Sequence, residues 1–178
     1  MKPRDIELYP ASGFFLDIGA NDGIKNNKTL RLQKKGWAGL CVEASPRIYS
    51  RLLKNRSSDI VLCMNECLVS EKNSKKIIKF FDGDQSGLAN GIIPNKNFSN
   101  HDDFRWKNKD KIDDFCTTTG QDKNIIEIEA KSLYEILEWT EAPRIINYAK
   151  FDIEGAEFSF FRISIDVYRD RAGYKKNL

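Results

Sequence analysis

Short apolar runs alternate with segments of helical periodicity over the first seventy residues of the chain. The runs at 14–18, 39–43 and 60–64 have the length and composition of buried strands. Between them, segment 27–35 is expected to form one helix, and a second helix begins at Ser45-Pro46, where serine caps the first turn. Strand, helix, strand, helix, strand at this spacing predicts right-handed crossovers and a parallel sheet of the α/β class.

The second half of the chain is less regular. We expect the third strand to continue through 67–70, and a polar stretch at 82–124 to act as a lid or substrate loop, because structureless loops of that length are uncommon in compact domains. The remaining predicted elements are strands at 76–81, 125–129 and 145–152, a helix with a capping box at 132–139, a helix from Phe158 and a short strand at 163–165.

Composition narrows the class of protein. The 178 residues suit a single domain over 1–178, and the net charge of +3 is too small to indicate a nucleic-acid surface. No apolar run is long enough to span a membrane, and the N-terminal residues lack the apolar core of a signal peptide. The four cysteines show no metal-ligand spacing, which favours reduced thiols in a cytoplasmic protein and no metal site.

Three predicted strands end in an acid, namely Asp17, Glu43 and Asp152. In a doubly wound sheet the carboxyl ends of the strands line one crevice, so these three side chains are expected to share a pocket. The alternative is that these acids simply mark strand ends, where polar residues are common. Their joint occurrence with a glycine turn favours a binding site.

That turn, Gly19-Ala20-Asn21-Asp22-Gly23, lacks the third glycine of a dinucleotide fingerprint. Asn21 and Asp22 place side-chain acceptors where a pyrophosphate would need bare amide groups. A cofactor with a ribose and a positive centre but no phosphate fits better, and S-adenosylmethionine has that composition. A nicotinamide-dependent oxidoreductase is the weaker interpretation.

Three blocks, at 15–23, 36–43 and 151–157, together resemble the FkbM family of S-adenosylmethionine-dependent methyltransferases. The resemblance implies a Rossmann-like class I methyltransferase fold with a mostly parallel sheet and flanking helices. It also implies methyl transfer to a hydroxyl oxygen of a sugar or glycoconjugate, with a glycan or small-molecule acceptor as partner.

The resemblance also assigns roles to residues. Asp17, Gly19, Asn21 and Gly23 would surround the methionine part of the cofactor, and Glu43 would bind its ribose. Thr29 matches a family threonine, although Asn27 and Lys28 replace the serine and asparagine before it, and Ala44 stands where proline is common. The full expected cofactor set is Asp17, Gly19, Ala20, Asn21, Gly23, Thr29, Glu43, Ala44, Asn65 and Glu66, the last two on the adenine side.

Asp152 and Glu154 are the candidates for orienting or deprotonating an acceptor hydroxyl. A structural role at the strand end is the alternative for Asp152. His101, the only histidine, is expected to be a solvated loop residue rather than a general base. Phe98, Phe104 and Trp106 form either a saccharide-binding surface or anchors for the loop.

The chain is short at its C-terminus for a seven-stranded methyltransferase sheet, because only residues 153–178 follow the last predicted strand. A shortened protein, a fragment and a sheet completed in a homodimer all remain open. The corresponding functional alternative is a non-catalytic cofactor-binding or interaction module that retains the fold.

Overall fold

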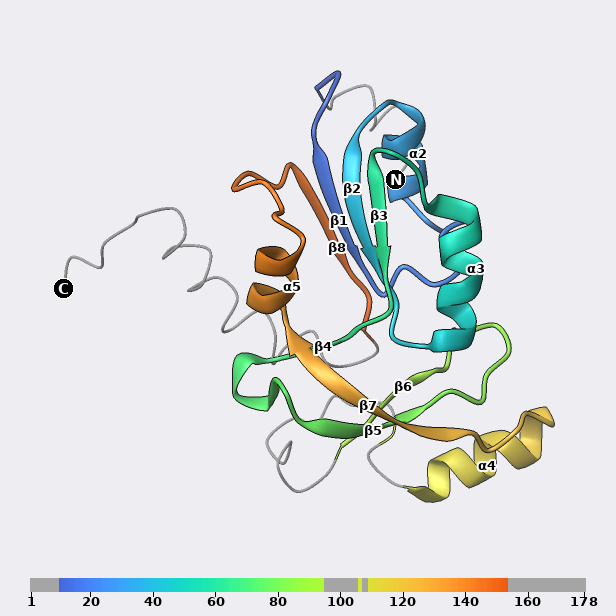
Figure 1. The fold of residues 1–178 in the computed structure, drawn as a ribbon. Coiled ribbons are helices and arrows are strands. Elements are labelled where there is room, and N and C mark those ends of the chain that lie inside the picture. Colours follow the sequence, from blue (N-terminus) through green and yellow to red (C-terminus); the bar gives the residue numbers. More distant parts are fainter. Residues whose placement is uncertain (1–9, 95–105, 107–108, 154–178) are drawn as a thin grey trace. The chain divides into compact units, whose positions relative to one another are not determined.

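The computed structural model describes residues 10–94, 106 and 109–153, and Figure 1 shows its fold. The chain divides into two compact units. The first comprises Met1–Glu66 and Ile145–Asp152, and the second comprises Cys67–Arg144 and Ile153–Leu178. The predicted helix from Phe158, the strand at 163–165 and the side chains of Phe98, His101, Phe104 and Glu154 lie outside the described residues.

The first unit contains a sheet of four parallel strands (Figure 1). Its order is β3-β2-β1-β8, with helices α2 and α3 in the crossovers between β1, β2 and β3. The predicted α/β class with a mostly parallel sheet is therefore confirmed. The bounds are β1 Phe14–Ile18, α2 Thr29–Lys34, β2 Ala38–Val42, α3 Pro46–Arg56, β3 Val61–Met64 and β8 Tyr148–Phe151.

Local signals fix the ends of both helices. The Ser45 hydroxyl accepts a hydrogen bond from the Ile48 NH at 3.1 Å, and proline follows as the first helical residue of α3. Helix α2 starts at Thr29, and the side-chain oxygen of Asn27 accepts the Leu30 NH at 3.1 Å. Beyond its end, Gly36 adopts a φ of 88°, which is the left-handed conformation typical of a helix C-terminus.

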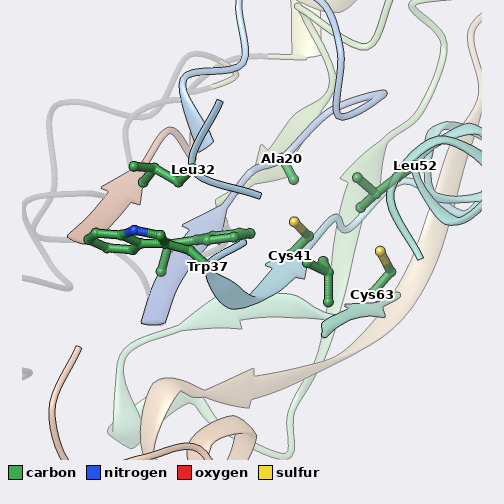
Figure 2. Close-up of a cluster of buried hydrophobic side chains, with 8 residues drawn as sticks. Ala20, Leu32, Trp37, Cys41, Leu52 and Cys63 are labelled. Carbon is green, nitrogen blue, oxygen red and sulfur yellow. The ribbon is translucent and has the colours of Figure 1, made fainter. Parts of the chain in front are cut away.

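The core of this unit lies between the sheet and its helices (Figure 2). Its largest side chain, Trp37, is fully buried and donates from its indole NH to the Pro10 carbonyl at 3.1 Å. Cys41 and Cys63 lie opposite each other on β2 and β3, and both are free thiols. Their mutual hydrogen bond, followed by burial, raises the pKa of Cys41, and the same bond lowers the pKa of Cys63. The cluster comprises Phe15, Ala20, Leu32, Trp37, Cys41, Leu52, Val61 and Cys63.

The second unit is built on a mixed sheet of order β4-β7-β5-β6, in which β4 and β7 are parallel and the other pairs antiparallel. The predicted capping box is present at Ser132 and Glu135, and it opens helix α5. The bounds are β4 Cys67–Val69, η1 Glu71–Asn73, β5 Ile77–Phe81, β6 Gly91–Ile93, α4 Lys109–Thr119, β7 Ile125–Ser132 and α5 Leu133–Trp139.

Two predictions about this half of the chain are wrong. The third strand does not continue to residue 70, because β3 and β4 belong to different sheets. The polar stretch at 82–124 is not without regular structure, since it contains β6 and α4. Within this stretch Trp106 is buried, donates to the Ala89 carbonyl at 2.9 Å and makes edge contacts with Phe81 and Phe115. Trp106 is thus an anchor on the core, while a role of this stretch as a substrate loop stays a prediction.

No helix within the described parts of the chain is long and apolar enough to cross a membrane. Within those same parts, no cluster of three or more histidine, cysteine, aspartate or glutamate side chains is arranged to hold a metal ion.

Candidate functional site

The carboxyl ends of the four parallel strands finish in register. Ile18 at the end of β1 lies opposite both Val42 and Phe151. Val42 in turn lies opposite Met64 at the end of β3. The next residue of each strand therefore joins a single row across the edge of the sheet, which we call the strand-end row. It consists of Asn65, Glu43, Gly19 and Asp152.

Backbone hydrogen bonds hold this row together. The Glu43 NH donates to Met64, the Gly19 NH to Val42 and the Asp152 NH to Ile18, all at 2.9–3.0 Å. The chain passes from β1 outward to β2 and β3, and β8 then pairs with the other side of β1. The row is consequently at the point where the strand order reverses, which is where open α/β sheets bind their ligands.

The glycine turn leads out of this row, and its amide groups are already engaged. Each of the seven backbone NH groups from Gly19 to Lys25 donates to an acceptor within the chain. The acceptors are the carbonyls of Val42 and Ala20 and the side chains of Glu43, Asn21 and Asp22. A turn of this kind is unlike the bare amide cradle that binds phosphate.

Both glycines of the turn are required by close packing as well as by conformation. Gly19 has a φ of 73°, and a Cβ atom there would lie 1.8 Å from the Asp152 carbonyl oxygen. Gly23 has a φ of 76°, and a Cβ atom there would lie 2.3 Å from Cγ of Arg56. Residues with a side chain rarely adopt this backbone conformation. Alanine would therefore be strained at either position even without the close contacts.

Glu43 is fixed in orientation by the loops on either side of it. Its Oε2 accepts the Asn21 NH at 3.0 Å, and its Oε1 accepts the Ser45 NH at 2.9 Å. The side-chain amide of Asn65 donates to the carbonyls of Glu43 and Ala44 at 2.8 and 3.0 Å. The structure thus brings Asn21, Glu43, Ala44 and Asn65 together, with the half-buried Glu66 next in the chain.

Asp17 supports the turn from beneath instead of facing solvent. It is fully buried, and its Oδ2 accepts hydrogen bonds from the Thr29 hydroxyl at 2.6 Å and the Asn27 amide at 2.8 Å. The Asn27 amide also donates to the Ala20 carbonyl at 3.1 Å. Thr29 is itself fully buried, so among the predicted cofactor residues Asp17 and Thr29 lie behind the row.

Sequence reasoning missed Arg56, which is fully buried beneath the glycine turn. Its guanidinium donates to the Gly23 carbonyl, to Asn27 Oδ1 and to the Thr29 hydroxyl at 3.0–3.1 Å, and also to Gln33. Helical spacing offered a signal, because Arg56 repeats the interval of four residues that separates the buried Ile48 and Leu52 on α3. A charged residue on that apolar face indicates a buried polar network.

Sequence reasoning also missed Lys150 on β8. Its side chain links Asp17 and Gly19, at the end of β1, to Asp152, which follows β8. Its Nζ lies 3.0 Å from the Gly19 carbonyl, 3.3 Å from Asp17 Oδ1 and 3.4 Å from Asp152 Oδ2. Asp17 is fully buried, whereas the Asp152 side chain is 61% exposed. The available signal was a lysine inside an apolar strand, two residues before Asp152 and therefore on the same face.

Comparison with known proteins yields one finding. A family model described as a methyltransferase FkbM domain matches residues 17–173, which is most of the chain. No curated protein and no solved structure matches it. The matched range begins at Asp17 in β1 and takes in the whole strand-end row.

Proposed function

The chain belongs to the FkbM methyltransferase family, and we propose that it transfers a methyl group from S-adenosylmethionine to a hydroxyl oxygen of a sugar or glycoconjugate. Methyl transfer in general follows from family membership. The identity of the donor, the acceptor class and the residue roles are the proposed part. The observation that carries the proposal is the acceptor-rich strand-end row beside a glycine turn whose amides are already bonded.

The donor is inferred from the chemistry of these groups. S-adenosylmethionine carries ribose hydroxyls, an ammonium group and a sulfonium centre, which are recognised by acceptors and negative charge. Glu43, held at the end of β2, is suited to accept the ribose hydroxyls. A dinucleotide would instead need free amides for its pyrophosphate, and the engaged amides of residues 19–25 argue against a nicotinamide cofactor.

When bound, S-adenosylmethionine supplies a methyl group activated by positive sulfur. The protein then has to align an acceptor oxygen and take up its proton. Asp152 lies in the row next to Gly19 with an exposed carboxylate, so it is suited to accept a hydrogen bond from the acceptor hydroxyl and its proton as the oxygen is methylated. Glu154, outside the described residues, is the second candidate for this role.

Calorimetry with S-adenosylhomocysteine tests the donor half of the proposal. We expect the wild-type protein to bind, and Glu43→Ala to weaken binding by about 10- to 100-fold, since hydrogen bonds to a charged group contribute roughly 1.5–3 kcal/mol. The matched control is Glu129→Ala, an exposed glutamate on β7, which should bind as the wild type does. Absence of binding by folded wild-type protein would overturn the proposal.

A screen of hydroxylated acceptors with labelled methyl donor tests the other half. We expect methyl incorporation into a sugar or glycoconjugate, and a loss of turnover in Asp152→Asn with donor binding retained. Donor binding without turnover on any acceptor would instead support the alternative of a non-catalytic binding module.

A further inference from the structure

We infer that Lys150 limits how strongly the strand-end row prefers a cationic methyl donor over the neutral demethylated product. This inference rests on the proposed function, because it concerns how the same site distinguishes two ligands. It assigns to Lys150 a role in specificity that is separate from any part in the chemical step.

Lys150 lies between two carboxylates in what we call the Lys150 cluster, which consists of Asp17, Lys150 and Asp152. The two nitrogen–oxygen distances, 3.3 and 3.4 Å, differ by only 0.1 Å, so neither carboxylate is its sole partner. The Lys150 side chain is 19% exposed, which means that solvent screens it less than a surface ion pair. One cation shared by two carboxylates leaves the cluster with one surplus negative charge.

Two further charged groups of the site, Glu43 and Arg56, offset each other. Glu43 adds one negative charge to the row, and Arg56 adds one positive charge beneath the glycine turn. The hydrogen-bond partners of Arg56 are uncharged groups, and Thr29 and Asn27 each bond to both Arg56 and Asp17. Across these five side chains the net charge is one negative unit, and Asp22 in the glycine turn and the half-buried Glu66 after Asn65 add further negative charge.

A surplus of negative charge favours a ligand of net positive charge. S-adenosylmethionine carries an ammonium group, a sulfonium centre and one carboxylate, so its net charge is +1. S-adenosylmethionine and S-adenosylhomocysteine share every other group, and differ by one methyl group and the charge on sulfur. Contacts with the adenosine and amino-acid parts therefore cancel when the affinities of the two ligands are compared. The ratio of their dissociation constants reports on the charge of the site and on the space for a methyl group.

Two substitutions are expected to move this ratio in opposite directions. Lys150→Gln removes the cation and should raise the preference for S-adenosylmethionine by about 3- to 10-fold, as expected for one charge acting at the edge of a protein. Asp152→Asn removes one carboxylate and should lower that preference by a similar factor of about 3 to 10. Lys150→Arg keeps the charge and should leave the ratio unchanged.

Calorimetric titration of each variant with both ligands measures this ratio. When the titrations are repeated at high ionic strength, the shifts caused by Lys150→Gln and Asp152→Asn should both become smaller. The matched control is Lys131→Gln, which removes a lysine paired with Glu129 on β7. If Lys150 had a purely structural role, its replacement would weaken the binding of both ligands equally. The ratio of their dissociation constants would then stay constant.

The outcomes separate this inference from the proposed function. If wild-type protein binds neither ligand, the proposed function fails. If both ligands bind but the ratio is the same in wild type, Lys150→Gln and Asp152→Asn, the inference about Lys150 is wrong while the proposed function stands. Should Lys150→Gln fail to fold, Asp152→Asn still decides the matter, because its exposed side chain can be changed without disturbing the buried Asp17.

Discussion

Two buried aspartates, one in each unit, are stabilised in different ways. Asp17 in the first unit is held by Asn27, Thr29 and Lys150, the last of which lies 133 residues away in the sequence. Asp84 in the second unit is held by Ser86 and Ala89, within five residues. These hydrogen bonds of Asp84 can form in a short segment, whereas the contact of Asp17 with Lys150 requires β8 to pair with β1.

This difference separates global from local polar networks. A local network stabilises the turn or helix end that contains it, and its loss should cost about 1 kcal/mol, as for a helix cap. A network that joins β1, α3 and β8 is formed only when the whole unit folds. Substitutions in it should affect the stability of the unit and the shape of the glycine turn together.

The largest expected effect is that of Arg56→Met. It removes the buried donors of the Gly23 carbonyl and of the Asn27 and Thr29 side chains that hold Asp17. Because each buried acceptor left without a donor costs about 1–3 kcal/mol, the free energy of unfolding should fall by about 3–5 kcal/mol. Urea denaturation measures it. Arg51→Met, an exposed arginine on the same helix, should change stability by less than about 0.5 kcal/mol. Equal effects of the two would remove the distinction between global and local networks.

A smaller effect is expected from Gly19→Ala, for which Gly36→Ala is a matched control. Both glycines have positive φ, but a Cβ atom at Gly36 meets nothing within 4 Å, while at Gly19 it meets the Asp152 carbonyl. Gly36→Ala should cost only the conformational strain of about 1–2 kcal/mol. Gly19→Ala should cost about 1–3 kcal/mol more from overpacking, measured by thermal and urea unfolding. Similar costs would mean that β8 adjusts freely to the turn.

The smallest expected effect concerns the capping box of α5. Burial alone would raise the pKa of Glu135, but hydrogen bonds from the Ser132 NH and from the Ser74 and Ser132 hydroxyls, together with Lys75, lower it to about 2. Because the folded-state pKa lies below the ordinary value of 4.5, the stabilisation is complete above pH 4.5 and is lost as pH falls toward 2.

Glu135→Gln should accordingly lower stability by about 1 kcal/mol at neutral pH. The difference from wild type should disappear near pH 2, as followed by melting temperature across this range. A difference that is independent of pH would show that the charge of Glu135 does not contribute to the cap.

The sequence was most informative where a structural rule acts over few residues. The apolar runs of β1 and β2, the Ser45 cap, the Gly36 stop and the capping box at Ser132 were all predicted from adjacent residues. Glu43 and Asp152 could be predicted to share one edge because parallel strands end together, whereas Asp17 lies within β1 and is buried behind that edge. Their individual roles in binding and catalysis remain predictions.

The parts that sequence reasoning missed depend on distant partners. Arg56 donates hydrogen bonds to Gly23 and Asn27, and Lys150 donates one to Asp17. These partners are distant in the sequence, so no local pattern predicts the contacts. The strand and helix within 82–124 were not predicted, because the residues of this stretch that pack in the core, Ala89, Ile93, Trp106 and Ile112, are separated by polar residues in the sequence. Composition averaged over a window conceals such isolated anchors.

The engaged amides of the glycine turn have a consequence for the kinetics of recognition. Because residues 19–25 complete their hydrogen bonds within the chain, the turn has its shape before any ligand arrives. A preorganised turn loses little conformational entropy when a ligand binds. The association rate is therefore not limited by ordering of the loop. Differences in affinity between ligands should then appear mainly in their dissociation rates.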